Sequence, residues 1–96
     1  MLESEIHRLK GELLLSAGND EAAAQSFRDA IELARRQSAK SWELRATTSL
    51  ARLLAKQDRR DEARAMLGEI YGWFTEGFDT ADLKNAKALL DELGIV

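Results

Sequence analysis

The sequence predicts an all-α fold, and three observations lead to that prediction. The chain has no proline, and Ala, Leu, Glu, Arg and Lys, which are strong helix formers, dominate its composition. Apolar residues recur at the spacing of one helical face, and nothing in their pattern requires a sheet. Short polar stretches separate five such segments, which predicts five helices in a single domain over residues 1–96.

The first two helices are expected to form a hairpin over about residues 3–37. Gly18 and Asn19 end the first helix, because both residues tolerate the left-handed conformation of a helix C-cap. Asp20 is expected to cap the second helix, in which Glu32 and Arg36 can pair on the exposed side. The stripe expected to be buried in the first helix is Ile6, Leu9, Leu13, Leu14 and Ala17; in the second it is Ala23, Phe27, Ala30, Ile31 and Ala34.

A second hairpin is expected over about residues 41–74, followed by a capping helix over about residues 80–93. Ser38 or Ser41 can cap the third helix, and the polar residues 58–60 form the turn before the fourth. Asp79 or Thr80 can cap the last helix, which Gly94 ends.

An internal repeat of forty residues relates the two hairpins. The shift places small residues on small residues and large ones on large ones. Small residues let the helices of one hairpin approach closely, and large ones are expected to fill the space between hairpins. The matched pairs are Gly11/Ala51, Leu14/Leu54, Ala23/Ala63, Phe27/Leu67 and Ala30/Ile70.

The pattern G-x-x-L followed by A-x-x-x-F-x-x-A between Gly11 and Ala30 resembles the tetratricopeptide repeat. That resemblance implies a tetratricopeptide-like right-handed α-α superhelix, made of two helix hairpins and a C-terminal capping helix. The chain departs from the family pattern in three ways. Its period is forty rather than thirty-four, the closing proline is missing, and other residues occupy the usual Trp and Tyr positions (His7, Leu14, Thr47 and Leu54).

A second resemblance covers nearly the whole chain. The segments at residues 5–15 (EIHRLKGELLL), 41–46 (SWELRA) and 71–84 (YGWFTEGFDTADLK) resemble the C-terminal part of bacterial multidomain adenylate/guanylate cyclase-like proteins. In that family a cyclase or winged-helix domain precedes an AAA-type/STAND ATPase and a helical-repeat array. The resemblance implies that the chain is the C-terminal end of a larger signalling protein. No cyclase or ATPase motif lies in these residues, so neither activity is assigned to them.

Residue types argue against a catalytic, cofactor-binding or metal site. The chain has no cysteine and one histidine, so His7 has no second histidine or thiolate with which to form a zinc site or a catalytic dyad. No phosphate-binding loop or dinucleotide fingerprint is present, and Gly68-x-x-x-Gly72 signals close helix packing at most. We therefore expect no enzyme activity, no cofactor and no metal, and we interpret His7 as an ordinary surface or half-buried side chain.

Charge, hydropathy and cysteine content indicate the cellular location and one class of partner to exclude. The net charge of −3 disfavours nucleic-acid binding, and no apolar run is long enough to cross a membrane. The absence of cysteine and of a signal-peptide pattern fits a cytoplasmic protein.

Two surfaces are candidate binding sites. Arg45, Arg52 and Lys56 share one helix face, and the repeat pattern places Arg8 beside them in a groove. This strip can bind an acidic peptide or an anion, or it can be a solvated face balanced by Glu5 and Glu12.

The second surface is aromatic and lies around the end of the fourth helix. It is either a partner-facing patch or the packing that docks the last helix on the fourth. Its members are Tyr71, Trp73, Phe74 and Phe78.

The function expected from these patterns is contact with other proteins. The leading hypothesis is a non-catalytic scaffold that packs on preceding repeats of its parent chain or on another protein. The isolated chain is expected to form homo-oligomers through the helix 1/helix 2 end, because a solenoid of two hairpins leaves one end uncapped. The alternatives are a peptide- or anion-recognition module, or part of a transcriptional regulator.

Overall fold

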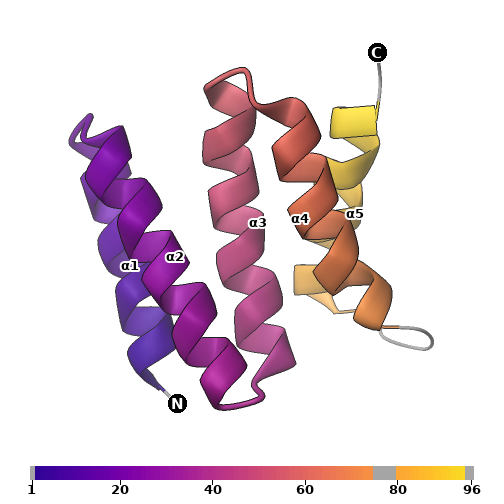
Figure 1. The fold of residues 1–96 in the computed structure, drawn as a ribbon, viewed down its shortest axis with the longest axis horizontal. Helices are drawn as coiled ribbons and strands as arrows, with labels where there is room; N and C mark the ends of the chain where they lie inside the picture. Colours follow the sequence, from indigo (N-terminus) through magenta and orange to yellow (C-terminus); the bar gives the residue numbers. More distant parts are fainter. Residues whose placement is uncertain (1, 75–79, 95–96) are drawn as a thin grey trace.

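A computed structural model of the chain describes residues 2–74 and 80–94, which contain five α-helices and no strand (Figure 1). The all-α prediction is confirmed, and the predicted helix bounds agree to within about two residues. The helices are α1 (Leu2–Ser16), α2 (Asp20–Arg36), α3 (Lys40–Lys56), α4 (Arg60–Trp73) and α5 (Ala81–Gly94).

The helices form two layers between which the chain alternates. Each helix packs on the next one in sequence, and α3 also packs on α1 and on α5. The backbones of α2 and α4 nowhere approach within 8 Å, so α1, α3 and α5 make one layer while α2 and α4 cover it (Figure 1). The molecule measures 35 × 35 × 19 Å, about two helices thick in its short dimension. Because α3 contacts all four other helices, it is the centre of the core.

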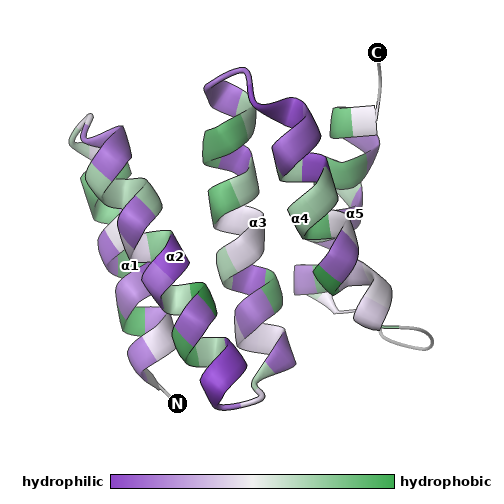
Figure 2. Ribbon diagram, in the orientation of Figure 1, coloured by the Kyte–Doolittle hydropathy of each residue, from purple (hydrophilic) through white to green (hydrophobic). Residues whose placement is uncertain are grey.

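The first three turns have the same backbone geometry at intervals of twenty residues. In each, one residue takes a left-handed conformation, and the next donates its N–H to the carbonyl five residues earlier, at 2.9, 2.8 and 2.8 Å. These are the features of a Schellman helix end. The sequence at the α3–α4 turn is strongly hydrophilic (Figure 2). The left-handed residues are Gly18 (φ 82°), Ser38 (φ 53°) and Asp58 (φ 66°).

Two helix caps differ from those predicted, and a third, at the start of α5, agrees with one of the two predicted residues. Asn19 caps α2, because its Oδ1 accepts the N–H of Ala22 at 3.3 Å, and Asp20 is the first helical residue. Ala39 precedes α3 without a side-chain cap, so the Ser38 or Ser41 cap was wrong. Thr80 caps α5 by accepting the N–H of Leu83 at 3.3 Å, and Asp79 lies outside the described residues. The predicted Glu32–Arg36 pair forms at 2.7 Å.

The residues matched by the forty-residue shift have matching environments, apart from one half-buried leucine. All the matched positions are buried except Leu14, which is only partly covered. Gly11 lies against the ring of Phe27, where an added Cβ would come within 2.5 Å of Cε1. Phe27 therefore packs inside its own hairpin, where the pattern had suggested only the space between hairpins.

The apolar stripe predicted to be buried in α1 was wrong. Ile6 is 61% exposed, Leu9 50% and Leu13 73%. The buried side of α1 carries smaller residues, and Ser4 donates its hydroxyl to the carbonyl of Ala30 at 2.8 Å. The neighbouring helix lies on the side that carries Gly11, because only a glycine leaves room for the Phe27 ring. The more apolar side of α1 is left without a neighbour in the described chain.

Candidate functional site

Ion pairs join the three helices of the inner layer where the sequence predicted a basic groove. Arg45 on α3 makes two hydrogen bonds to Asp82 on α5, at 2.9 and 3.2 Å, and one to Glu5 on α1 at 3.2 Å. Arg8 binds the same Glu5 carboxylate through its Nε at 3.1 Å, and its Nη1 lies 3.4 Å from Glu12. The structure thus brings Arg8 and Arg45 together as predicted, but through the one carboxylate, Glu5, that both of them bind.

These contacts shift the ionisation of two groups. The hydrogen bond from Arg8, helped by Arg45, lowers the pKa of Glu5 even though partial burial acts in the opposite direction. The hydrogen bonds to Asp82, followed by the one to Glu5, raise the pKa of Arg45. Arg45 also lies over the ring of Trp42, with its Cζ 5.4 Å from the ring centroid. Both shifts favour the charged forms of Glu5 and Arg45.

The lowered pKa of Glu5 predicts a loss of stability in acid. Above its ordinary pKa near 4.5 the carboxylate is charged in both states, and its folded-state contacts contribute fully to the free energy of unfolding. As the pH falls through the lower folded-state pKa, the folded chain must take up a proton and this contribution disappears. Urea unfolding between about pH 5 and pH 3 should show a smaller loss of stability for Glu5→Gln than for the unchanged chain. Glu21→Gln, at an exposed position, is the matched control; an equal effect at both sites would contradict the assignment.

The groove is therefore not a basic surface at its α1 end. Two guanidiniums there face three carboxylates, those of Glu5, Glu12 and Asp82. Ser49 also donates its hydroxyl to Glu12 at 3.2 Å. A cavity of about 220 Å³ opens beside this network; it is lined by Arg8, Arg45, Thr48, Ser49, Arg52, Asp82 and Asn85. This arrangement matches the prediction of a solvated face balanced by Glu5 and Glu12 more closely than the prediction of a site for an acidic peptide or an anion.

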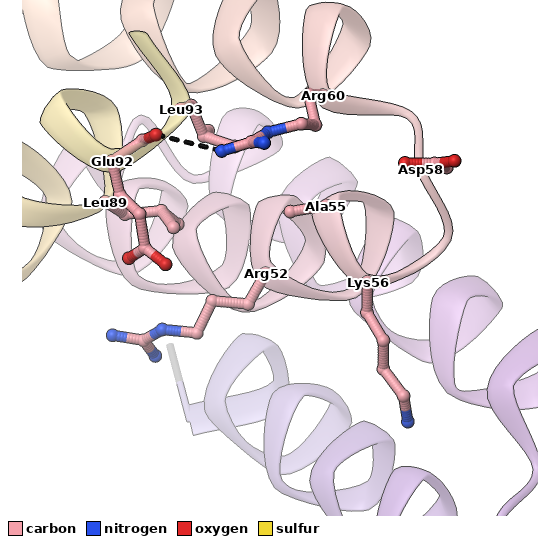
Figure 3. A pocket seen from close by; sticks show the side chains of 8 residues that line it. All are labelled: Arg52, Ala55, Lys56, Asp58, Arg60, Leu89, Glu92 and Leu93. Atoms are coloured by element: carbon pink, nitrogen blue, oxygen red, sulfur yellow. Dashed lines mark hydrogen bonds between the residues drawn. The ribbon is translucent and has the colours of Figure 1, made fainter. Parts of the chain in front are cut away.

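The other end of the groove holds Arg52 and Lys56. They border a cavity of about 440 Å³ with an apolar wall of Ala55, Leu89 and Leu93 (Figure 3). Their side chains point in different directions from α3, and Lys56 Nζ lies 4.0 Å from Asp20 (Figure 3). Arg60, across the cavity, donates to the carbonyl of Glu92 at 3.0 Å. Arg52 and Lys56 thus share a helix face without converging on one point.

The predicted aromatic patch divides into buried and exposed members. Tyr71 and Phe74 are half-buried against the core, whereas Trp73 is 54% exposed. The rings of Trp73 and Phe74 meet edge to face with centroids 5.1 Å apart, and Lys40 Nζ lies 5.5 Å from the centre of Trp73. Phe78 lies outside the described residues. Part of the patch therefore contributes to the core, and Trp73 alone among the described members presents a large exposed surface.

A surface that the sequence placed in the core is the largest apolar feature outside it. Four large apolar side chains are exposed in the described parts of the chain, and three of them lie on α1. Ile6, Leu9 and Leu13 follow the i, i+3, i+7 spacing and so share one side of the helix. We call these three residues the α1 face. The signal that pointed to it was the incomplete solenoid, which predicted an uncovered apolar end without identifying the side chains.

The remaining sequence features have ordinary environments. His7 is half-buried, and no group of three metal-ligating side chains occurs among residues 2–74 and 80–94. A Cβ added at Gly68 or Gly72 would meet no atom within 4 Å, so this glycine pair does not mark close helix packing. None of the helices in the described ranges combines the length and apolarity that a membrane span requires.

Comparison with known proteins adds no assignment. No protein-family model, curated protein or solved structure matches this chain. The tetratricopeptide-like and cyclase-like resemblances therefore stay predictions.

Proposed function

We propose that this chain is a non-catalytic protein-interaction module, a short tetratricopeptide-like superhelix that serves a larger signalling protein of the cyclase-like or ATPase class. The alternation of helices between two layers and the repeated turn geometry support the superhelical arrangement. The proposed role is cytoplasmic contact with preceding repeats of a parent chain or with another protein, and it involves no cofactor or nucleic acid.

The α1 face is the observation that carries this proposal. Large apolar side chains at a helical spacing on one surface mark an interaction site when nothing in the chain covers them. Leu13, in the last turn of α1, is 73% exposed, which leaves most of an isobutyl group in water. Covering such a side chain contributes about 1.5–3 kcal/mol, so the three together can drive association.

Peptide or anion recognition in the groove is less well supported. Arg8 and Arg45 are held by carboxylates of the chain itself, so an acidic ligand would have to displace Glu5 or Asp82. Arg52 is the candidate that makes no ion pair among the described residues, and one exposed arginine is a weak site.

Sedimentation of the isolated chain tests the proposal. We expect a concentration-dependent association at high micromolar concentration, because none of the described residues covers the α1 face. The variant Leu9→Gln with Leu13→Gln should be monomeric at the same concentration and equally helical by circular dichroism. Ala88→Gln with Asp91→Asn, on the exposed side of α5, is the control that should associate like the unchanged chain. The proposal would be contradicted by a chain that stays monomeric at all concentrations tested, or by association that persists after the α1 substitutions.

A further inference from the structure

We infer that the α1 face is the docking site for an antiparallel helix hairpin that continues the forty-residue repeat and presents a cation opposite Glu3. This inference rests on the proposed function, and it names the partner by its structure. The occupant would cover α1 as the first hairpin covers α3 and as the second covers α5.

The repeat itself shows what the α1 face is built to meet. A shift of forty residues carries Ile6, Leu9 and Leu13 onto positions of α3, and a shift of eighty carries them onto α5. All six of those positions are buried, with exposures between 0 and 7%. They are Ala46, Ser49 and Leu53 in α3, and Ala86, Leu89 and Leu93 in α5. The equivalent side is thus covered in α3 and in α5, each of which follows a hairpin, and it is exposed in α1.

Directions around α3 show that the preceding hairpin provides this cover. Glu43 pairs with Arg35 on α2 at 2.9 Å, and Ser49 hydrogen-bonds to Glu12 on α1 at 3.2 Å. At about 100° per residue, Ala46 and Leu53 lie between these two directions on the helix. They therefore face the junction of α1 and α2. By the same register, Ile6 and Leu13 face the place where the two helices of a preceding hairpin would meet.

The charged residues at the α2–α3 interface predict a second property of the docked hairpin, a basic residue at the end of its second helix. Glu43 is buried in the α2–α3 interface, where Arg35 from the last turn of α2 reaches its carboxylate and Lys40 Nζ lies 3.6 Å away. The forty-residue shift places Glu3 at the position of Glu43. A hairpin seated in this register would bring the end of its second helix to Glu3. Glu3 already accepts a hydrogen bond from the side chain of Gln37. A basic residue of the occupant would add to this contact the ion pair that Arg35 makes with Glu43.

The far end of the molecule does not fit the α1 face. The side of α5 turned away from α3 and α4 carries Lys84, Lys87 and Asp91, all exposed. Stacking one copy head-to-tail on another would bury these charged groups against Leu9 and Leu13, which is unfavourable. Two copies that meet through their α1 faces avoid this cost, and that arrangement is the competing outcome of the test.

A tandem chain tests the inference. Residues 1–40 are placed directly ahead of residues 1–96, so that the inner copy of α1 follows a hairpin in the register of α3. The outer copy carries Ile6→Gln, Leu9→Gln and Leu13→Gln to suppress self-association. Because the chain has no cysteine, Leu13→Cys in the inner copy is a single reporter for a thiol reagent. Leu53→Cys in the unchanged chain provides the buried reference, and Leu13→Cys in that chain provides the exposed one.

The expected result is that the thiol of the inner Leu13→Cys substitution reacts at least about tenfold more slowly in the tandem chain than in the single chain, at a concentration where both are monomeric. Arg35→Ala in the outer copy should restore part of the reactivity, whereas Arg36→Ala should not. If the in-register tandem does not fold, the same hairpin joined through a Gly/Ser linker of about fifteen residues must give the protection. A reporter thiol that stays fully reactive in a folded tandem overturns the inference. Self-association of the single chain through α1 would in that case leave the proposed function standing.

Discussion

Leu53→Ala should lower the free energy of unfolding by about 3 kcal/mol, whereas Leu13→Ala at the equivalent position of the first hairpin should change it by less than about 0.5 kcal/mol. The two leucines have the same chemistry and the same place in the repeat, but Leu53 is 1% exposed and Leu13 is 73% exposed. Truncating Leu53 leaves a cavity in the helix that all the others contact, so the loss affects the whole domain. A loss of this size is a large part of the roughly 5–15 kcal/mol that typically holds a domain together.

Urea unfolding followed by circular dichroism measures both changes, under conditions where the chain is monomeric. A single transition that moves to lower urea in Leu53→Ala, with an unchanged slope, is expected because α3 joins both hairpins and α5. Equal effects of the two substitutions would mean that α1 is covered in solution. Two separate transitions would mean that the hairpins unfold independently.

Gly11→Ala should be the most destabilising small substitution on α1, at about 1–2 kcal/mol. The added methyl would lie 2.5 Å from Cε1 and 2.7 Å from Cδ1 of Phe27, whose ring is fully buried and cannot move freely. Overpacking of this kind costs about 1–3 kcal/mol, and the better helix propensity of alanine recovers up to about 1 kcal/mol of it. Thermal unfolding should therefore show a midpoint lowered by about 4–16 °C.

The second hairpin supplies the compensating change. It carries Ala51 and Leu67 where the first carries Gly11 and Phe27, and both are fully buried. Phe27→Leu alone should leave a cavity and destabilise the chain, but combined with Gly11→Ala it rebuilds the pair found in the second hairpin. The double variant should therefore be more stable than the sum of the single effects predicts, by about 1 kcal/mol. Gly68→Ala on α4 is the control, because no atom lies within 4 Å of its added Cβ and it should not destabilise.

Local pattern was enough to predict the five helices, and it failed where a helix could bury either of two sides. Periodicity finds the most apolar side of α1, but a side is buried only if a neighbour lies there. The position of α2 depends on the fit of Phe27 against Gly11, which a count of apolar residues does not register. The serine caps predicted for α3 were wrong because the turn places Ala39 at the start of that helix, and alanine has no side chain that can accept a hydrogen bond.

The candidate groove was predictable in position and unpredictable in charge. Residues at i, i+7 and i+11 must share a helix face, which placed Arg45, Arg52 and Lys56 together. The groups that neutralise Arg45 are Glu5 and Asp82, forty and thirty-seven residues away in the sequence. Ion pairs over such separations depend on how helices are arranged, so the rules for pairs within one helix could not reveal them.

The left-handed turn residues at positions 18, 38 and 58 also limit how such a chain can change its length. One helix with its turn occupies twenty residues, and successive helices fall in opposite layers. Inserting one twenty-residue unit would move every later helix to the other layer. Apolar side chains that are buried between neighbouring helices of the inner layer would then be exposed to water. Inserting forty residues would leave every helix in its own layer. Growth or loss by whole hairpins is thus the change that this architecture tolerates, and the smaller helix-and-turn step is the one that it resists.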